Sequence, residues 1–461
     1  MKRKQSAAWL LCICLLLTGC TAGNDTVSLW DAITSLFQEK NPDFTYEAID
    51  GGVAVTGYQG SETTVTVPDT LDGKPVLAIG EKAFANQTSL TAVTLPAQLR
   101  QIGDYAFANC TQLTQLDLPD GLTSIGSYAF YGCTTLSALI LPDSVTAVGE
   151  AFAAGCLLLS RCRLPEGLAT LPSAAFYSCK SLNDLTLPTA LTSIEAGAFN
   201  SCTALTRLVL PDTVSALGAA VFGGCINLRS VTLPAALKEL PEQTFIGCTA
   251  LQTVAWPKTL TSIGEQSFSG CASLVDFSLP DTVTSVGTAA FYECTALKTC
   301  ALPAGLTELA PYLFAGCSSL AELRCPSSVR RIGEAAFHGC SSLTDLVLPE
   351  EITELGTAVF NGCAALTSFT VPAGITELPD YCFSLCTSLA SVSLPAGLQA
   401  IGEAAFGGCT ALTVLTVPAS VASIGANAFA DCSESFILQG GAGSAAETYA
   451  AENSLTFRSA F

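Results

Sequence analysis

Fifteen cysteines recur every 23 residues along most of the chain, from Cys110 to Cys432, among 22 cysteines in all. Thiols at a fixed spacing could form disulfides, bind a metal or act as nucleophiles. Ladder cysteines on adjacent strands would lie roughly 5 Å apart, which is within disulfide range. A zinc site needs converging ligands instead, and the sequence has no CxxC pair.

The other cysteines favour a structural role for the thiols. Cys12 and Cys14 fall in a segment that we expect to be removed, and lipidation of Cys20 would then leave 19 thiols, an odd number. Four more replace small or apolar residues that should point inward: Cys162, Cys300, Cys325 and Cys382. We therefore predict buried, mostly reduced thiols that behave as small hydrophobic side chains, with scattered disulfides or metal binding as the alternatives.

Residues suited to acid–base catalysis are sparse. His338 is the single histidine, at a repeat position that elsewhere holds Tyr131 or Asn200, so we expect a partly exposed turn residue. The acids Asp120 and Asp143 fall in turns, where solvation explains them better than a paired-carboxylate site does. The sequence thus predicts a protein that is not an enzyme and has no cofactor or metal site.

The elements that position these residues repeat with the same period. A phenylalanine occurs every 23 residues from Phe84 to Phe429, with one position, Ala153, lacking it. Each cysteine of the ladder comes three residues after this column, and an LxxLxLP segment follows. One repeat cannot bury its own Leu and Phe, so the repeats must stack into a solenoid with a continuous core.

Each part of the repeat has a predicted structure. The LxxLxL segment alternates inward and outward residues, as a short parallel strand with one buried face does, and proline ends it. Gly126 and its equivalents are expected to allow a tight turn. The following segment, SYAFYGC in one repeat, is expected to form a short helical or 3₁₀ turn that returns the chain to the next strand.

The first twenty residues read as a targeting signal. MKRKQSAAWLLCICLLLTGC has a basic start and an apolar run too short to span a bilayer, which is typical of a secretory signal peptide. The ending LTGC resembles a bacterial lipobox, in which Cys20 would receive a lipid. The alternative is an ordinary signal peptide with a chance cysteine. No later apolar run is long enough to cross a membrane, so we expect an anchored protein rather than a transmembrane one.

The repeat pattern LTxLxLPxxLTSIGxxAFxxCTS, between Val76 and Cys432, resembles BspA-type (treponemal-type) leucine-rich repeats. This resemblance implies a bacterial surface lipoprotein with a parallel sheet on a concave face and turns on a convex one. The flanking segments look like the β-rich N-terminal cap and the small α/β C-terminal cap of that family. The expected organisation is signal peptide 1–19, tether 20–43, N-terminal cap 44–75, repeat array 76–434 and C-terminal cap 435–461.

The outward residues of the strands form the expected binding surface. Small residues, hydroxyls and scattered charges dominate it, whereas aromatic residues are missing, which argues against glycan stacking and also removes the usual hot spots of protein interfaces. Trp256 replaces an inward leucine and should lie in the core. The candidate binding residues on the concave face are Arg161, Arg163, Asp184, Arg207, Glu322, Arg324 and Asp345.

Charge and family resemblance together suggest the kind of partner. Removal of the signal peptide takes three of the 19 basic residues, so 16 remain against 39 acidic ones, a formal charge of −23. Such a chain repels phosphate backbones, which excludes nucleic acid as a partner. The resemblance implies an exported monomer that is lipid-anchored at the cell surface and binds a host or microbial surface or matrix protein. A structural spacer in the envelope and, less so, glycan binding are the alternatives.

One repeat departs from the pattern. The segment VGEAFAAGC places Phe152 one residue early and Ala153 at the column position. Phe152 could fill the usual pocket if the turn shifted by one residue; otherwise Ala153 leaves a void there. The same repeat carries Arg161 and Arg163, with Arg207 two repeats on. This group is either a solvated charge ladder or a binding site for an acidic partner.

Overall fold

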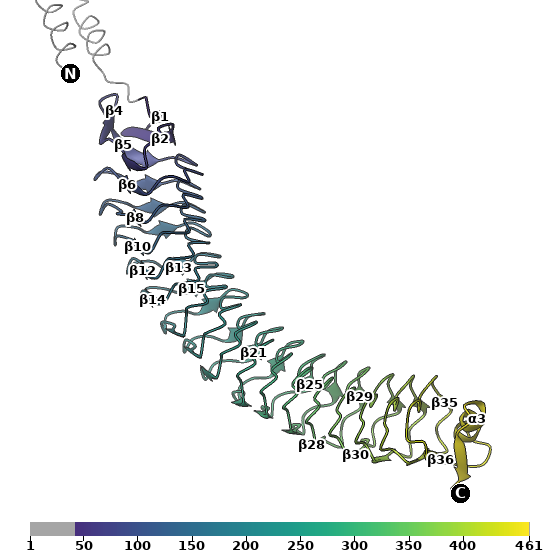
Figure 1. The fold of residues 1–461 in the computed structure, drawn as a ribbon. Coiled ribbons are helices and arrows are strands. Elements are labelled where there is room, and N and C mark those ends of the chain that lie inside the picture. Colours follow the sequence, from purple (N-terminus) through teal and green to yellow (C-terminus); the bar gives the residue numbers. More distant parts are fainter. Residues whose placement is uncertain (1–41, 461) are drawn as a thin grey trace, which may run out of the picture.

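The computed structural model describes residues 42–460, most of which form one elongated stack of 23-residue turns (Figure 1). The signal peptide, Cys20 and nearly all of the tether lie outside the described residues. Each turn of the stack, hereafter a rung, contributes two short strands, which pair in parallel with equivalent strands of adjacent rungs in successive sheets of mostly three strands. The predicted repeat solenoid is therefore confirmed.

The LxxLxL segments form one set of strands, here called the long column. Most of these strands have three residues, and the middle one points inward. The column comprises β3 (Thr64–Thr66), β6 (Ala92–Thr94), β8 (Gln115–Leu116), β10 (Ala138–Ile140), β12 (Arg161–Arg163), β14 (Asp184–Thr186), β16 (Arg207–Val209), β18 (Ser230–Thr232), β20 (Thr253–Ala255), β22 (Asp276–Ser278), β24 (Thr299–Ala301), β26 (Glu322–Arg324), β28 (Asp345–Val347), β30 (Ser368–Thr370), β32 (Ser391–Ser393), β34 (Val414–Thr416) and β36 (Ile437–Gly440).

A second set of strands, the short column, follows the proline of each rung. The sequence analysis did not foresee it, because two residues are too few to show an alternating pattern. These strands are β7 (Gln101–Ile102), β9 (Ser124–Ile125), β11 (Ala147–Val148), β13 (Thr170–Leu171), β15 (Ser193–Ile194), β17 (Ala216–Leu217), β19 (Glu239–Leu240), β21 (Ser262–Ile263), β23 (Ser285–Val286), β25 (Glu308–Leu309), β27 (Arg331–Ile332), β29 (Glu354–Leu355), β31 (Glu377–Leu378), β33 (Ala400–Ile401) and β35 (Ser423–Ile424).

Other elements lie at the two ends of the stack. At the N-terminal end, β1 (Phe44–Ile49) and β2 (Gly52–Tyr58) pair antiparallel, and β2 then pairs in parallel with β5 (Lys74–Ile79), against which β4 (Thr70–Leu71) also lies. At the C-terminal end, α3 (Ala445–Glu452) leads into β37 (Thr456–Ser459), which pairs with β36. That these elements are the expected caps, with the expected boundaries, stays a prediction.

The turn that closes each rung is not helical, which corrects the sequence-based expectation. Residues such as Tyr128, at a φ of 56°, and Gly132, at a φ of 68°, interrupt the right-handed backbone that a helix needs. The amide N–H groups also donate between rungs; that of Tyr128, for example, bonds the Glu150 carbonyl at 2.8 Å. The third side of each rung is therefore a hydrogen-bonded ladder, like the two strand columns.

Gly126 has a different role from the one expected. Its φ is not positive, so a turn conformation does not require glycine there. A side-chain carbon at this position would lie 2.6 Å from the Gly103 carbonyl carbon of the preceding rung. Glycine is thus needed for the close approach of two rungs.

The phenylalanine column forms the centre of the core. Its rings are fully buried or nearly so and stack on one another with centroid separations of 5.1–5.8 Å and interplanar angles of 4–25°. Away from the irregular rung and the two ends of the column, each ring therefore gains both apolar burial and an offset-stacking partner on either side. Trp256 packs against Phe268 and Phe277, close to the core position expected, although it is only partly buried.

The irregular rung keeps its backbone register and breaks the ring stack. Ala151 has a positive φ, as Tyr128 does at the equivalent position of the preceding rung. The Ala153 carbonyl accepts a hydrogen bond from the Cys179 thiol, as the phenylalanines of the column do from their ladder cysteines. The turn has therefore not shifted. Phe152 is nonetheless buried, and its ring meets Phe176 edge-on at 5.4 Å and 69°. Within residues 42–460 it makes no ring contact with Phe130.

The stack bends along its length, and the bend differs from the expected one. In Figure 1 the labels of long-column strands such as β14 and β28 follow the outer side of the bend, and those of short-column strands such as β21 and β29 follow its inner side. The expected concave face assumed a single sheet opposite looser turns. Here all three sides of a rung carry backbone ladders, so pairing on the long column does not by itself make that side the inner one.

Candidate interaction surface

The ladder cysteines are core residues with a specific hydrogen bond. Fourteen of the fifteen are buried, and the last, Cys432, is partly exposed. Each thiol donates to the backbone carbonyl of the column residue in the preceding rung, as Cys110 does to Phe84, at sulfur–oxygen distances of 3.0–3.3 Å. The predicted burial is confirmed, and each thiol adds a hydrogen bond that an apolar side chain at the same position could not donate.

Burial also makes these thiols poor nucleophiles. Removal from water disfavours the thiolate and raises the pKa of Cys110 and of Cys225 to about 12. His338 lies exposed on a turn, as expected. Residues 42–460 hold no cluster of three or more His, Cys, Asp or Glu side chains placed to bind a metal ion.

The Ser and Thr residues of the rungs have a structural role that the sequence analysis missed. Many of their hydroxyls donate to a carbonyl of the preceding rung, as Thr123 does to Arg100 at 2.9 Å and Thr192 does to Ala169 at 3.0 Å. These bonds satisfy backbone oxygens along the edges of the columns. The recurrence of Thr at one position of the repeat was the available signal.

The outward side chains of the long column form one continuous surface, here called the strand face. All seven candidate binding residues lie on it and are exposed. They form two groups that are well separated along the stack, one on β12, β14 and β16 and the other on β26 and β28.

In the first group, most of the basic charge is already paired. The Arg161 guanidinium lies 3.3 Å from the Asp184 carboxylate. Arg163 donates two hydrogen bonds to Asp143, at 2.8 and 2.9 Å, which lowers the pKa of that carboxyl. Arg207 makes no ion pair with any of the described residues. The sequence analysis grouped the three arginines by strand spacing but treated Asp143 as a solvated turn acid.

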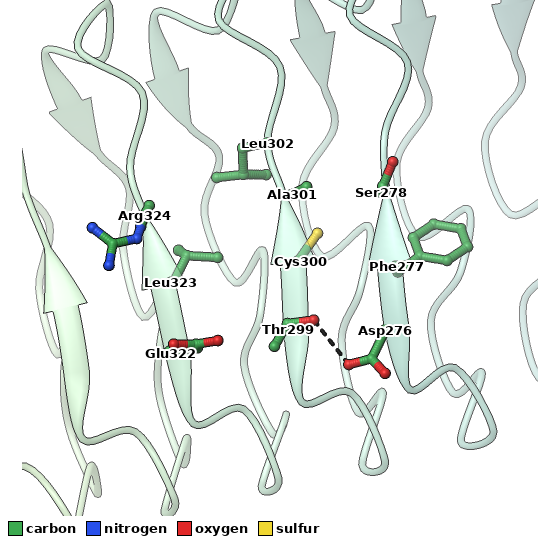
Figure 2. A pocket seen from close by; sticks show the side chains of 10 residues that line it. All are labelled: Asp276, Phe277, Ser278, Thr299, Cys300, Ala301, Leu302, Glu322, Leu323 and Arg324. Carbon is green, nitrogen blue, oxygen red and sulfur yellow. Dashed lines mark hydrogen bonds between the residues drawn. The ribbon is translucent and has the colours of Figure 1, made fainter.

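The second group borders a shallow hollow of about 490 Å³ across β22, β24 and β26, here called the trough. Its middle strand presents the short side chains Thr299 and Ala301, while Asp276 and Glu322 rise on the strands to either side (Figure 2). Cys300, Leu302, Leu323 and Phe277 also line the hollow and give it a largely apolar floor. The sequence analysis named Glu322 and Arg324 as candidate binding residues but did not predict a hollow beside them.

The charges around the trough are largely unpaired. The Thr299 hydroxyl donates to Asp276 at 2.9 Å, the bond drawn in Figure 2. Neither Asp276, Glu322 nor Arg324 forms an ion pair within residues 42–460. Glu322 moreover lies directly beside Asp345 in the register of β26 and β28. Like charges at such a cross-strand position repel one another.

Exposed aromatic residues occur elsewhere, on the turn side of the rungs. Tyr131, Tyr177 and Tyr292 are 37–46% exposed at the position that follows the phenylalanine column. The strand face itself has no outward aromatic residue, in agreement with the sequence analysis. No helix within residues 42–460 combines the length and the apolar character that crossing a membrane would require.

Comparison with known proteins agrees with this architecture. A family model described as "BspA type Leucine rich repeat region (6 copies)" matches residues 77–206, 192–321 and 307–435. No curated protein matches the chain. A leucine-rich repeat protein from Bacteroides ovatus is similar in structure, with a TM-score of 0.65 and 26% identity over 91% of this chain and 98% of that one. A leucine-rich cell surface protein from Faecalibacterium prausnitzii gives a TM-score of 0.53 and 28% identity, over 77% and 93% of the two chains.

Proposed function

The chain belongs to the BspA-type leucine-rich repeat family, and we propose that it is a lipid-anchored bacterial surface protein that binds another protein through its strand face. The observation that carries this proposal is the strand face itself. Fifteen strands from β6 to β34 extend it over roughly 70 Å at the spacing of a β-sheet. Its backbone is held by ladders on every side, so the face is preorganised for a large partner.

Residue composition supports a protein ligand rather than a glycan. Outward positions of the long column carry hydroxyls, small side chains and separated charges, which suit polar contacts with a polypeptide. Aromatic platforms for sugar rings are missing from this face in the described residues. That no enzyme activity accompanies binding stays a prediction. The structural spacer remains the second candidate, because a stack held by identical ladders is also a rigid rod.

A binding screen with the chain from Thr21 onward tests the proposal. The protein would be used to capture partners from host extracellular matrix and from bacterial surface extracts. A variant with Ser230→Trp and Thr253→Trp, both outward on the long column, should lose the captured protein. Ser285→Trp, outward on the short column, is the matched control and should retain it. Capture that survives the double substitution would contradict binding through the strand face, and no capture at all would favour the spacer.

The arginine group can be tested in the same assay. A variant carrying Ala at Arg161, Arg163 and Arg207 should lose salt-sensitive binding of an acidic partner while its melting temperature stays unchanged. Arg207→Ala alone should account for most of the loss, because the other two arginines are paired within the protein. Unchanged affinity for a ligand known to occupy the strand face would reject a role for this group.

The anchor is tested separately. Metabolic labelling with a fatty-acid analogue should mark the wild-type protein but not Cys20→Ala. Equal labelling of the two proteins would show that Cys20 is not the lipidated residue.

A further inference from the structure

We propose that the trough binds an arginine or lysine side chain from an extended segment of the protein partner. This proposal rests on the proposed function and adds the chemistry of the segment that the strand face recognises. The trough is distinct from the arginine group, which would attract the opposite charge.

The shape of the trough follows from unequal side-chain lengths on three neighbouring strands. Thr299 and Ala301 are short, whereas the strands on either side present Asp276 and Glu322. The α-carbons of those two acids are separated by two strand spacings, roughly 10 Å. This distance leaves room for one side chain to lie over Thr299 with a carboxylate on each side.

The lining of the trough matches a long basic side chain. Leu302 is partly exposed there and, with the small exposed parts of Cys300 and Phe277, forms apolar surface that suits the methylene stem of arginine or lysine. The cationic head would then reach the two carboxylates. A planar guanidinium can donate in two directions at once, so arginine fits this arrangement better than lysine.

Electrostatics favour a cation there for a second reason. Glu322 and Asp345 face each other on adjacent strands, and the protein supplies neither with a cation. A bound guanidinium would relieve this repulsion, which bound water cannot do as effectively. The net charge of −20 for the whole chain would also speed the approach of a basic segment.

Arg324 restricts what lies next to the bound cation. It is two residues beyond Glu322 on β26, and its side chain extends away from Ala301 in Figure 2. An extended partner segment that runs parallel to the strands, in the same N-to-C direction, places every second side chain against the face at nearly the same repeat. A second basic residue at that spacing would meet Arg324, whereas an acidic residue would pair with it. The favoured partner sequence is therefore Arg-x-Glu or Arg-x-Asp.

Fluorescent nonapeptides of Ser and Thr provide the probes. One carries Arg-x-Glu, the second citrulline-x-Glu, which keeps the shape and loses the charge, and the third Arg-x-Arg. We expect the first to bind about tenfold more tightly than the second in fluorescence anisotropy at moderate salt. Asp276→Asn combined with Glu322→Gln should remove this difference. Glu377→Gln, an exposed acid on β31 of the short column, is the matched control and should preserve it.

The third peptide tests the role of Arg324. Arg-x-Arg should bind more weakly than Arg-x-Glu to the wild-type protein, and Arg324→Gln should reverse that order. Equal binding of the arginine and citrulline peptides, or no saturable binding in the millimolar range, would overturn the proposal. If a captured partner is lost with Ser230→Trp and Thr253→Trp but not with the trough variant, the trough is wrong and the strand-face function stands.

Discussion

Two regions of the stack differ both inside and outside. Around Phe152 the ring stack is interrupted, and the arginines on the surface are mostly paired with acids of neighbouring rungs. Around Phe291 the rings stack without interruption, and the surface charges at the trough lack ionic partners. The paired charges already have ionic partners within the protein, whereas the unpaired charges at the trough can still pair with charges of another molecule.

The difference also shows how much variation a rung tolerates. Because the backbone ladders fix the register at both places, the phenylalanine can enter the core from either of two adjacent positions. The outward residues vary without changing the fold, since they take no part in the ladders. A solenoid of this kind can therefore alter its outward surface rung by rung while its interior stays almost constant.

Raising the pH should cause the largest loss of stability. It should unfold both regions alike, so that the difference between them disappears. Burial raises the thiol pKa values above those of the unfolded chain, so folding favours the protonated form. The resulting stability is complete below the unfolded value of about 8.5 and is lost as the pH rises through about 12. Circular dichroism between pH 7 and 12 should show cooperative loss of structure, and full structure at pH 12 would contradict this reading of the ladder.

Removal of a ring of the phenylalanine column should destabilise the protein to different extents in the two regions. Phe291→Ala should lower the free energy of unfolding by about 3–5 kcal/mol, as for buried aromatics in general. Phe152→Ala should cost about 1 kcal/mol less, since its ring lacks a partner on one side. Chemical denaturation of the two variants measures this difference. A negligible loss for Phe291→Ala would place that ring outside the core.

The irregular rung should also be repairable. Ala153→Phe alone should destabilise by about 1–3 kcal/mol, because two large rings would then compete for one layer of the core. Combining it with Phe152→Ala recreates the regular pattern and should restore at least the wild-type melting temperature. If the double variant were no more stable than Ala153→Phe alone, register rather than ring position would explain the irregularity.

The smallest expected effect concerns the unpaired charges. Asp345→Asn removes the repulsion with Glu322 and should raise stability slightly, by up to about 0.5 kcal/mol at low salt. Glu377→Gln, at the position equivalent to Glu354 in the next rung of the short column, should change it less, because the Glu354 carboxylate is already paired with Arg331. Thermal melts in low and high salt can resolve the two, and a clear loss of stability for Asp345→Asn would show that this carboxylate is already compensated.

The sequence predicted the period, the core positions and the outward residues of the strand face, because these depend on which residues recur every 23 positions, but it placed that face on the wrong side of the bend. It did not predict the short column or the non-helical turns, which depend on hydrogen bonds between rungs. The pairing of Arg163 with Asp143 was missed for the same reason, as the two residues belong to different parts of neighbouring rungs. The trough could have been predicted from the sequence, because Thr299 and Ala301 are short where the two neighbouring rungs carry the longer side chains of Asp276, Glu322 and Arg324.

The interrupted ring stack has a consequence for how the molecule unfolds. In a linear array, cooperativity passes from each rung only to its neighbours, so the weakest interface sets the boundary between folding units. The junction of Phe130 with Phe152 lacks the ring contact that most other junctions have. Hydrogen exchange should therefore divide the stack there into a short N-terminal unit and a long C-terminal one. A rod displayed at a cell surface would then yield to pulling in two steps rather than one.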